Sequence, residues 1–159
     1  MIYFAPKENL YYLFEQKLKS YGVTIGGEKI KEGSFSLQID DAKVYIESIK
    51  SADISNAKFL LLLAYNTLEI ENINLDGISV MFLPARVEKI KITHTLAEPF
   101  TLHIKAVGEF GAVDARFNFL HQHMHAVMIP NYIMIQKYQI TLNMFQEAKN
   151  GEYVYEKDI

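Results

Sequence analysis

Cysteine and tryptophan are both absent from the 159 residues of this chain. The missing cysteine excludes disulfide bonds, thiolate zinc sites and cysteine nucleophiles. Long apolar runs are missing too. The longest, from Phe59 to Ala64, is far shorter than the roughly 20 residues with which a helix crosses a bilayer.

A charge excess of either sign is also lacking. The chain has 16 basic and 19 acidic residues, a net charge of -3, and no block of like charge. Nucleic-acid-binding surfaces are strongly basic, so we expect no nucleic-acid partner. Half of the residues are apolar and 22% are charged, which is typical of a folded globular chain. The length fits a single domain over residues 1–159.

The first periodic segment, residues 7–21, is predicted to be an amphipathic helix. Its apolar residues recur at spacings of three and four and are Leu10, Leu13, Phe14, Leu18 and Tyr21. Pro6 suits the first turn of this helix, and Gly22 suits a left-handed stop after it. We expect the apolar face to pack on a sheet; the alternative is a helix lying on a membrane surface.

Residues 34–129 alternate between apolar and polar side chains, which predicts antiparallel strands. Asp40-Asp41 predicts a hairpin turn between two of them. The segment Lys58 to Tyr65 is apolar on both faces and predicts a central strand, and the alternation shifts at Glu71-Asn72, which indicates a bulge. Asp76-Gly77 predicts a tight hairpin turn that leads into a strand over residues 78–82.

Four later strands are predicted from the same alternation, over residues 89–93, 100–106, 113–119 and 124–129. Helical spacing returns over residues 131–148, and residues 153–155 are predicted to add a last strand. The fold class is therefore mainly β (α+β). We expect a single strongly curved antiparallel sheet or open barrel of about eight or nine strands, flanked by an N-terminal and a C-terminal helix.

His121, His123 and His125 form the one cluster with the character of metal ligands. Two imidazoles at alternate positions of a strand share a face and can hold zinc if a third ligand joins them. The competing interpretation is a polar hairpin tip, which would scatter the three rings. His94 is expected to face the core edge and His103 the solvent. The chain has no nucleophile elbow and no phosphate-binding glycine loop, so we expect no enzyme activity and no cofactor.

The abundant apolar side chains are the more informative feature. One face of a curved sheet would be lined by candidate ligand-binding residues, namely Phe35, Leu37, Phe100, Leu102, Ile104, Phe117 and Phe119. They fit a closed core filled by the two helices. They also fit an interior that stays partly open and accepts a lipid-like ligand.

Several segments resemble AsmA-like and type II secretion N-like proteins of the bacterial envelope. They are Phe4-Ala5-Pro6, residues 22–25, residues 33–37, residues 108–114 and Met128-Ile129-Pro130. The resemblance implies a periplasmic, inner-membrane-anchored β-sheet domain that binds or transports lipid or supports envelope assembly with other envelope proteins. The apolar opening residues would then be the remainder of a membrane tether. The alternatives are a structural or protein-interaction module, a lipocalin-like barrel and a cytoplasmic location.

Overall fold

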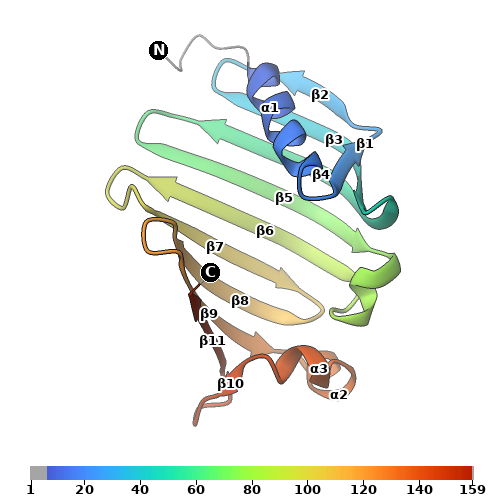
Figure 1. The fold of residues 1–159 in the computed structure, drawn as a ribbon, viewed down its shortest axis with the longest axis vertical. Coiled ribbons are helices and arrows are strands. Elements are labelled where there is room, and N and C mark those ends of the chain that lie inside the picture. Colours follow the sequence, from blue (N-terminus) through green and yellow to red (C-terminus); the bar gives the residue numbers. More distant parts are fainter. Residues whose placement is uncertain (1–6, 159) are drawn as a thin grey trace.

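The computed structural model describes residues 7–158, which form one large antiparallel sheet with three helices and a 3-10 helix (Figure 1). The strands are β1 (Val23–Gly26), β2 (Lys29–Glu32), β3 (Ser36–Ile46), β4 (Ile49–Leu61), β5 (Tyr65–Leu75), β6 (Arg86–Thr95), β7 (Thr101–Gly108), β8 (Gly111–Asn118), β9 (His123–Pro130), β10 (Gln146–Glu147) and β11 (Tyr153–Asp158). The helices are α1 (Lys7–Lys19), α2 (Tyr132–Lys137), α3 (Gln139–Leu142) and the 3-10 helix η2 (Gly77–Met81). No described helix is long and apolar enough to cross a membrane.

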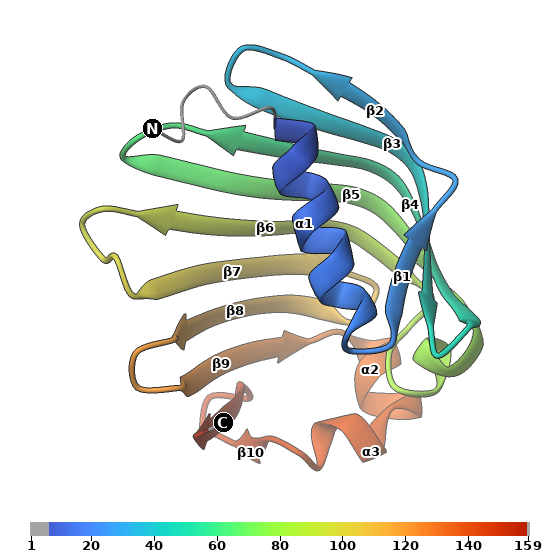
Figure 2. The ribbon, with the colours of Figure 1, turned by 45° about the horizontal axis from the view of Figure 1, so that its top comes forward.

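The eleven strands are ordered β1-β3-β4-β5-β6-β7-β8-β9-β11-β10, and β2 extends the edge formed by β1. The predicted mainly β, antiparallel sheet is confirmed, and the sheet is open. The strand count exceeds the expectation because the short edge strands β1, β2 and β10 carry too few residues to show alternation. Figure 2 shows the sheet curving around α1, with α2 and α3 near the far end of the strand order.

Two hydrophobic cores lie on the concave side. Under α1, Tyr11 is 4% exposed and packs with Leu37, Ile39, Ala42 and Ala57. Burial, and then the nearby carboxylate of Glu28, raise the pKa of the Tyr11 hydroxyl well above its usual value. The second core lies under α2 and α3 and contains Ala52, Ile73, Val87, Phe110, Met128, Met134 and Leu142.

The face that α1 turns to the sheet differs from the predicted one. Tyr11 points into the sheet, whereas Leu13, Phe14 and Tyr21 are 62%, 47% and 71% exposed. Of the predicted stripe only Leu18 is half-buried, and the side chain of Leu10 lies outside the described part of the chain. The helix is oriented by the Tyr11 ring, whose hydroxyl also donates a hydrogen bond to Glu28 Oε1 at 3.2 Å.

A line of irregular positions crosses four neighbouring strands. The residues on either side of Asp41, Ser55 and Asn72 pair in register with the neighbouring strands, but these three residues take no part in the pairing. On β6, a bulge at Glu88 shifts the register between β6 and β7 by one residue. Asp41 and Asn72 have positive φ values of 59° and 53°, a conformation that Asp and Asn tolerate better than most residues. The bulge predicted at Glu71-Asn72 therefore coincides with a real irregularity. The turn predicted at Asp40-Asp41 is wrong, because β3 runs straight through it.

Three further predictions are corrected at chain reversals. The central strand predicted over Lys58 to Tyr65 is wrong at its end, because β4 stops at Leu61 and β5 begins at Tyr65. Asp76 caps η2 by accepting a hydrogen bond from Gly77 N at 2.7 Å, so residues 78–82 form no strand. The helix predicted over residues 131–148 breaks at Tyr138, ends at Leu142 and is followed by β10.

Candidate ligand-binding face

The concave side carries a continuous apolar surface near one end of the strands. Cross-strand partners in an antiparallel sheet point to the same face. Leu102 pairs with Phe117, and Phe117 pairs with Met124; one step along the strands, Ile92 pairs with Ile104. We call this surface the concave patch, and it consists of Ile92, Phe100, Leu102, Ile104, Phe117, Phe119 and Met124.

The concave patch lies between the two hydrophobic cores and belongs to neither. On one flank, Phe59 and Leu68 pack against the core under α1. On the other, Ala106 and Val113 pack against the core under α2 and α3. The five patch residues on the strands are half-buried, and neither hydrophobic core contains them. The patch is therefore apolar sheet surface that is partly exposed to solvent.

Five of the seven predicted ligand-binding residues lie in this patch. Leu102, Ile104 and Phe117 are neighbours on β7 and β8. Phe100 and Phe119 extend the same face beyond the strand ends, 47% and 43% exposed, with ring centroids 5.9 Å apart in an edge-to-face contact.

The other two predicted residues lie elsewhere. Leu37 is on the concave face of β3 but is 3% exposed, because Tyr11 of α1 covers it. Phe35 precedes β3, is 48% exposed and lies at the β2–β3 connection. Both are separated from the patch by two intervening strands, β4 and β5.

Sequence reasoning missed Ile92 and Met124 as patch members. Ile92 was placed correctly on an alternating strand, and its parity with Ile90 was the signal that could have included it. Met124 gave no such signal on its own. Its place depends on the β8–β9 pairing, which sets Met124 opposite Phe117.

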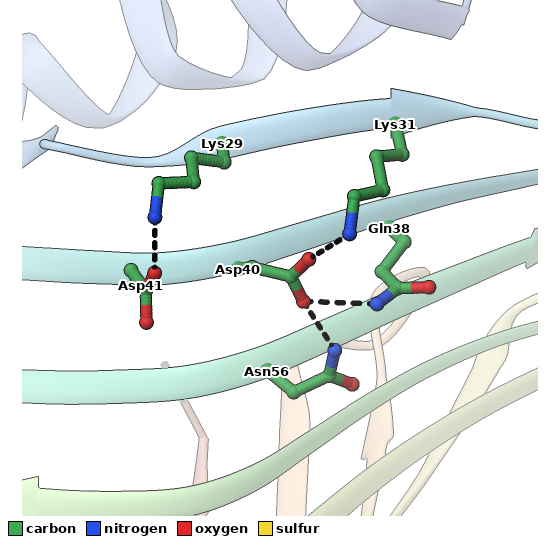
Figure 3. Close-up of polar contacts among 6 residues, drawn as sticks. All are labelled: Lys29, Lys31, Gln38, Asp40, Asp41 and Asn56. Atoms are coloured by element: carbon green, nitrogen blue, oxygen red, sulfur yellow. Dashed lines mark hydrogen bonds and ion pairs between the residues drawn. The ribbon is translucent and has the colours of Figure 1, made fainter.

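The convex face carries charged residues that pair across strands. Figure 3 shows Asp40 as an acceptor for Gln38, Lys31 and Asn56, at 2.9, 2.9 and 2.7 Å. The hydrogen bonds from Gln38, Lys31 and Asn56 lower the pKa of Asp40 to about 2. Lys29 pairs with Asp41 at 2.9 Å, which ties the edge strand β2 to β3 a second time.

The same pattern continues on the neighbouring strands. Lys91 and then Lys89 hold the pKa of the Glu69 carboxyl below its usual value. Lys105 forms an ion pair with Asp114 at 3.2 Å, between β7 and β8. These ion pairs link neighbouring strands on the convex face. They do not bring reactive side chains together in a cleft.

The histidine cluster is divided by the β8–β9 turn. His121 lies in the turn, whereas His123 and His125 lie on the convex face of β9 and contact Asp158 and Glu156 of β11 at 2.8 and 2.9 Å. A carboxylate of β11 therefore lies within hydrogen-bond distance of each of these two rings. Within residues 7–158, no group of three or more metal-ligating side chains is arranged to hold an ion.

Two shallow hollows adjoin these histidines on the convex face. The one at the strand ends, about 320 Å³ in volume, is lined by Glu98, Thr101, Arg116, Asn118, His123 and His125. Its histidines are engaged by carboxylates, and Glu98 also contacts His103. The mixture of charges gives this hollow no net preference for either sign.

His94 and His103 point as predicted. His94 lies on the concave face opposite Leu102, with its Nε2 3.0 Å from the carbonyl oxygen of Pro99. His103 lies on the convex face opposite Arg116. His94 borders the concave patch, but no second ionisable side chain faces it across the β6–β7 or β5–β6 pairing, where its partners are Leu102 and Asn66.

Comparison with known proteins finds no matching family model, no matching curated protein and no matching solved structure. The resemblance to AsmA-like proteins therefore stays a prediction from sequence pattern. Its first segment, Phe4-Ala5-Pro6, lies outside the described residues.

Proposed function

We propose that this chain is a non-enzymatic binding domain that takes an apolar, lipid-like ligand on the concave patch. The observation that carries the proposal is the solvent-facing strip of sheet between the two helix-covered cores. Contiguous exposed apolar surface on a soluble domain commonly marks a binding site. Here it also lies on the concave side of the curved sheet, and small-molecule sites are usually concave.

The expected affinity follows from the area that a ligand would cover. Apolar burial contributes about 25 cal/mol per Å², so covering on the order of 200 Å² contributes about 5 kcal/mol before the cost of association is subtracted. This free energy corresponds to binding weaker than micromolar unless polar contacts add to it. A chain that reaches across several strands would cover more surface.

A matched set of variants on one strand tests the proposal. Leu102→Gln and Ile104→Gln place polar amides in the concave patch, whereas Val107→Gln changes an exposed residue on the convex face of β7. We expect the first two to weaken binding of a fluorescent long-chain probe at least tenfold and the third to leave it unchanged. Thermal unfolding followed by circular dichroism controls for loss of fold.

Two outcomes would contradict the proposal. One is that the wild-type domain shows no saturable binding of any apolar probe. The other is that Val107→Gln weakens binding as much as Leu102→Gln, which would place the probe on the wrong face of the sheet.

The setting we propose for this activity is the bacterial envelope, in the periplasm and tethered to the inner membrane. Its support is the resemblance in residues 22–25, 33–37 and 108–114. Fractionation of cells that express the natural reading frame should recover the protein with the inner membrane or the periplasm. Recovery in the cytoplasmic fraction alone would contradict the setting and leave the binding proposal intact.

A further inference from the structure

A cationic side chain borders the concave patch at its β11 side. Lys157 pairs with Met124, which pairs in turn with Phe117, so all three side chains point to the concave face. Lys157 is exposed and has no ion-pair partner among the described residues. It is therefore a positive charge next to apolar surface.

The acids beside Lys157 in sequence do not neutralise it. Glu156 and Asp158 point to the opposite, convex face, because neighbouring residues of a strand alternate. There they contact His125 and His123. Because side chains alternate along β11, Lys157 lies on one face of the sheet and the two carboxylates lie on the other.

The patch leads away from Lys157 across the strands. From Met124 on β9 the apolar surface continues through Phe117 on β8, Leu102 and Ile104 on β7 and Ile92 on β6, to Leu68 on β5. Four spacings between neighbouring strands amount to about 19 Å along the sheet. This strip is long and narrow, and its charged end is at β11.

We propose that the ligand is a single-chain amphiphile with a carboxylate head, a long-chain fatty acid, whose carboxylate pairs with Lys157 and whose chain crosses the strands toward Leu68. This inference rests on the proposed function and names its ligand class. One ammonium group balances one carboxylate, whereas a phosphate monoester carries nearly two negative charges and calls for more donors than this edge offers. The elongated strip fits one extended chain.

The test compares three ligands with the same chain, a fatty acid, its alcohol and its phosphate monoester, each below its aggregation threshold. Titration calorimetry at pH 8 should show the fatty acid binding about tenfold more tightly than the alcohol, which corresponds to about 1.4 kcal/mol. Lys157→Gln should remove this difference while leaving the affinity for the alcohol unchanged. Lys105→Gln, on the convex face and paired with Asp114, is the control and should keep the difference.

Each other outcome has a distinct meaning. Equal binding of acid and alcohol by the wild type, or an unchanged difference in Lys157→Gln, would overturn the assignment of the head group and leave apolar binding in place. Tighter binding of the phosphate monoester than of the acid would overturn the carboxylate class. No binding of any of the three would overturn the proposed function itself.

Discussion

At the scale of single residues, the convex face shows how polar side chains hold an edge strand in place. Asp40 is the acceptor for three donors from β2, β3 and β4. Charge-assisted hydrogen bonds of this kind favour the ionised carboxylate, which is why the pKa of Asp40 falls to about 2. The carboxylate thereby links β2 to the body of the sheet.

Stability should depend on pH through this group. The unfolded chain takes up a proton at Asp40 near its ordinary pKa of about 3.9, whereas the folded chain resists protonation down to about pH 2. The contribution of the ionised carboxylate is thus fully present above about pH 4 and is lost as the pH falls toward 2. We expect wild-type protein to be more stable than Asp40→Asn at pH 6, with the gap shrinking between pH 4 and 2.

Urea unfolding at several pH values measures this gap. Asp41→Asn is a useful comparison, because Asp41 is exposed and, among the described residues, its carboxylate pairs with Lys29 alone. A gap between wild type and Asp40→Asn that stays constant from pH 6 to 2 would show that the ionised carboxylate is not what stabilises the strand.

Residue chemistry also explains which local predictions succeeded. Asp41 and Asn72 both adopt left-handed backbone conformations within strands. At Asn72 the shift in alternation was visible and predicted a bulge. At Asp41 two adjacent acids looked like a hairpin turn, because Asp favours turns and left-handed positions for the same reason. Only the pairing of β3 with β4 on both sides of Asp41 separates the two interpretations.

At the scale of elements, α2 and α3 act as a short plug on the concave side. Met134 and Leu142 are 0% and 1% exposed, and Phe145 contacts Tyr155 with ring centroids 5.5 Å apart. Neither helix is long enough to be stable alone, so packing against the sheet holds them. The long helix predicted for this region failed because its β-branched residues carry little helical preference.

Removing the side chain at the centre of this plug should destabilise the domain strongly. Met134→Ala leaves a cavity in the larger core and should lower the free energy of unfolding by about 2–5 kcal/mol. Ile135→Ala, one residue away and 42% exposed, should lower it by less than about 1 kcal/mol. Urea unfolding curves measure both, and similar losses for the two variants would contradict the packing described here.

At the scale of the whole molecule, the sheet is open and must protect its edges. The edge formed by β1 and β2 is interrupted between Gly26 and Lys29 and carries Lys29 and Lys31. Short, broken and charged edge strands discourage pairing with other chains. The other end is also protected, because β10 covers β11 only at Tyr153 and Val154 and the uncovered part carries charged residues.

Neutralising one edge should therefore promote association. The double variant Lys29→Val, Lys31→Val removes both positive charges of β2, and we expect it to form dimers or larger species where the wild type stays monomeric. Lys58→Val, on the exposed convex face of β4 between two strands, has no free edge and should stay monomeric. Light scattering after size-exclusion chromatography measures the mass of each variant. Association of Lys58→Val alone would show that added apolar surface, and not pairing at a free strand edge, drives association.

The sequence alone determined the antiparallel β architecture, the first helix and the four strands from β6 to β9. Alternation of apolar and polar residues is a local signal, and it depends only on neighbouring positions of one strand. His94 and His103 were placed on the correct faces for the same reason.

The tertiary structure decided which apolar residues are covered and which face solvent. Leu37 and Leu102 look alike in sequence, yet Leu37 is buried in the core under Tyr11, whereas Leu102 belongs to neither core and is partly exposed. Lys157 became a neighbour of Met124 through pairing between β9 and β11, which are separated by two helices and a strand. Such contacts depend on how segments that are distant in the sequence pack together in space. The alternation of apolar and polar residues along one strand carries no information about that packing.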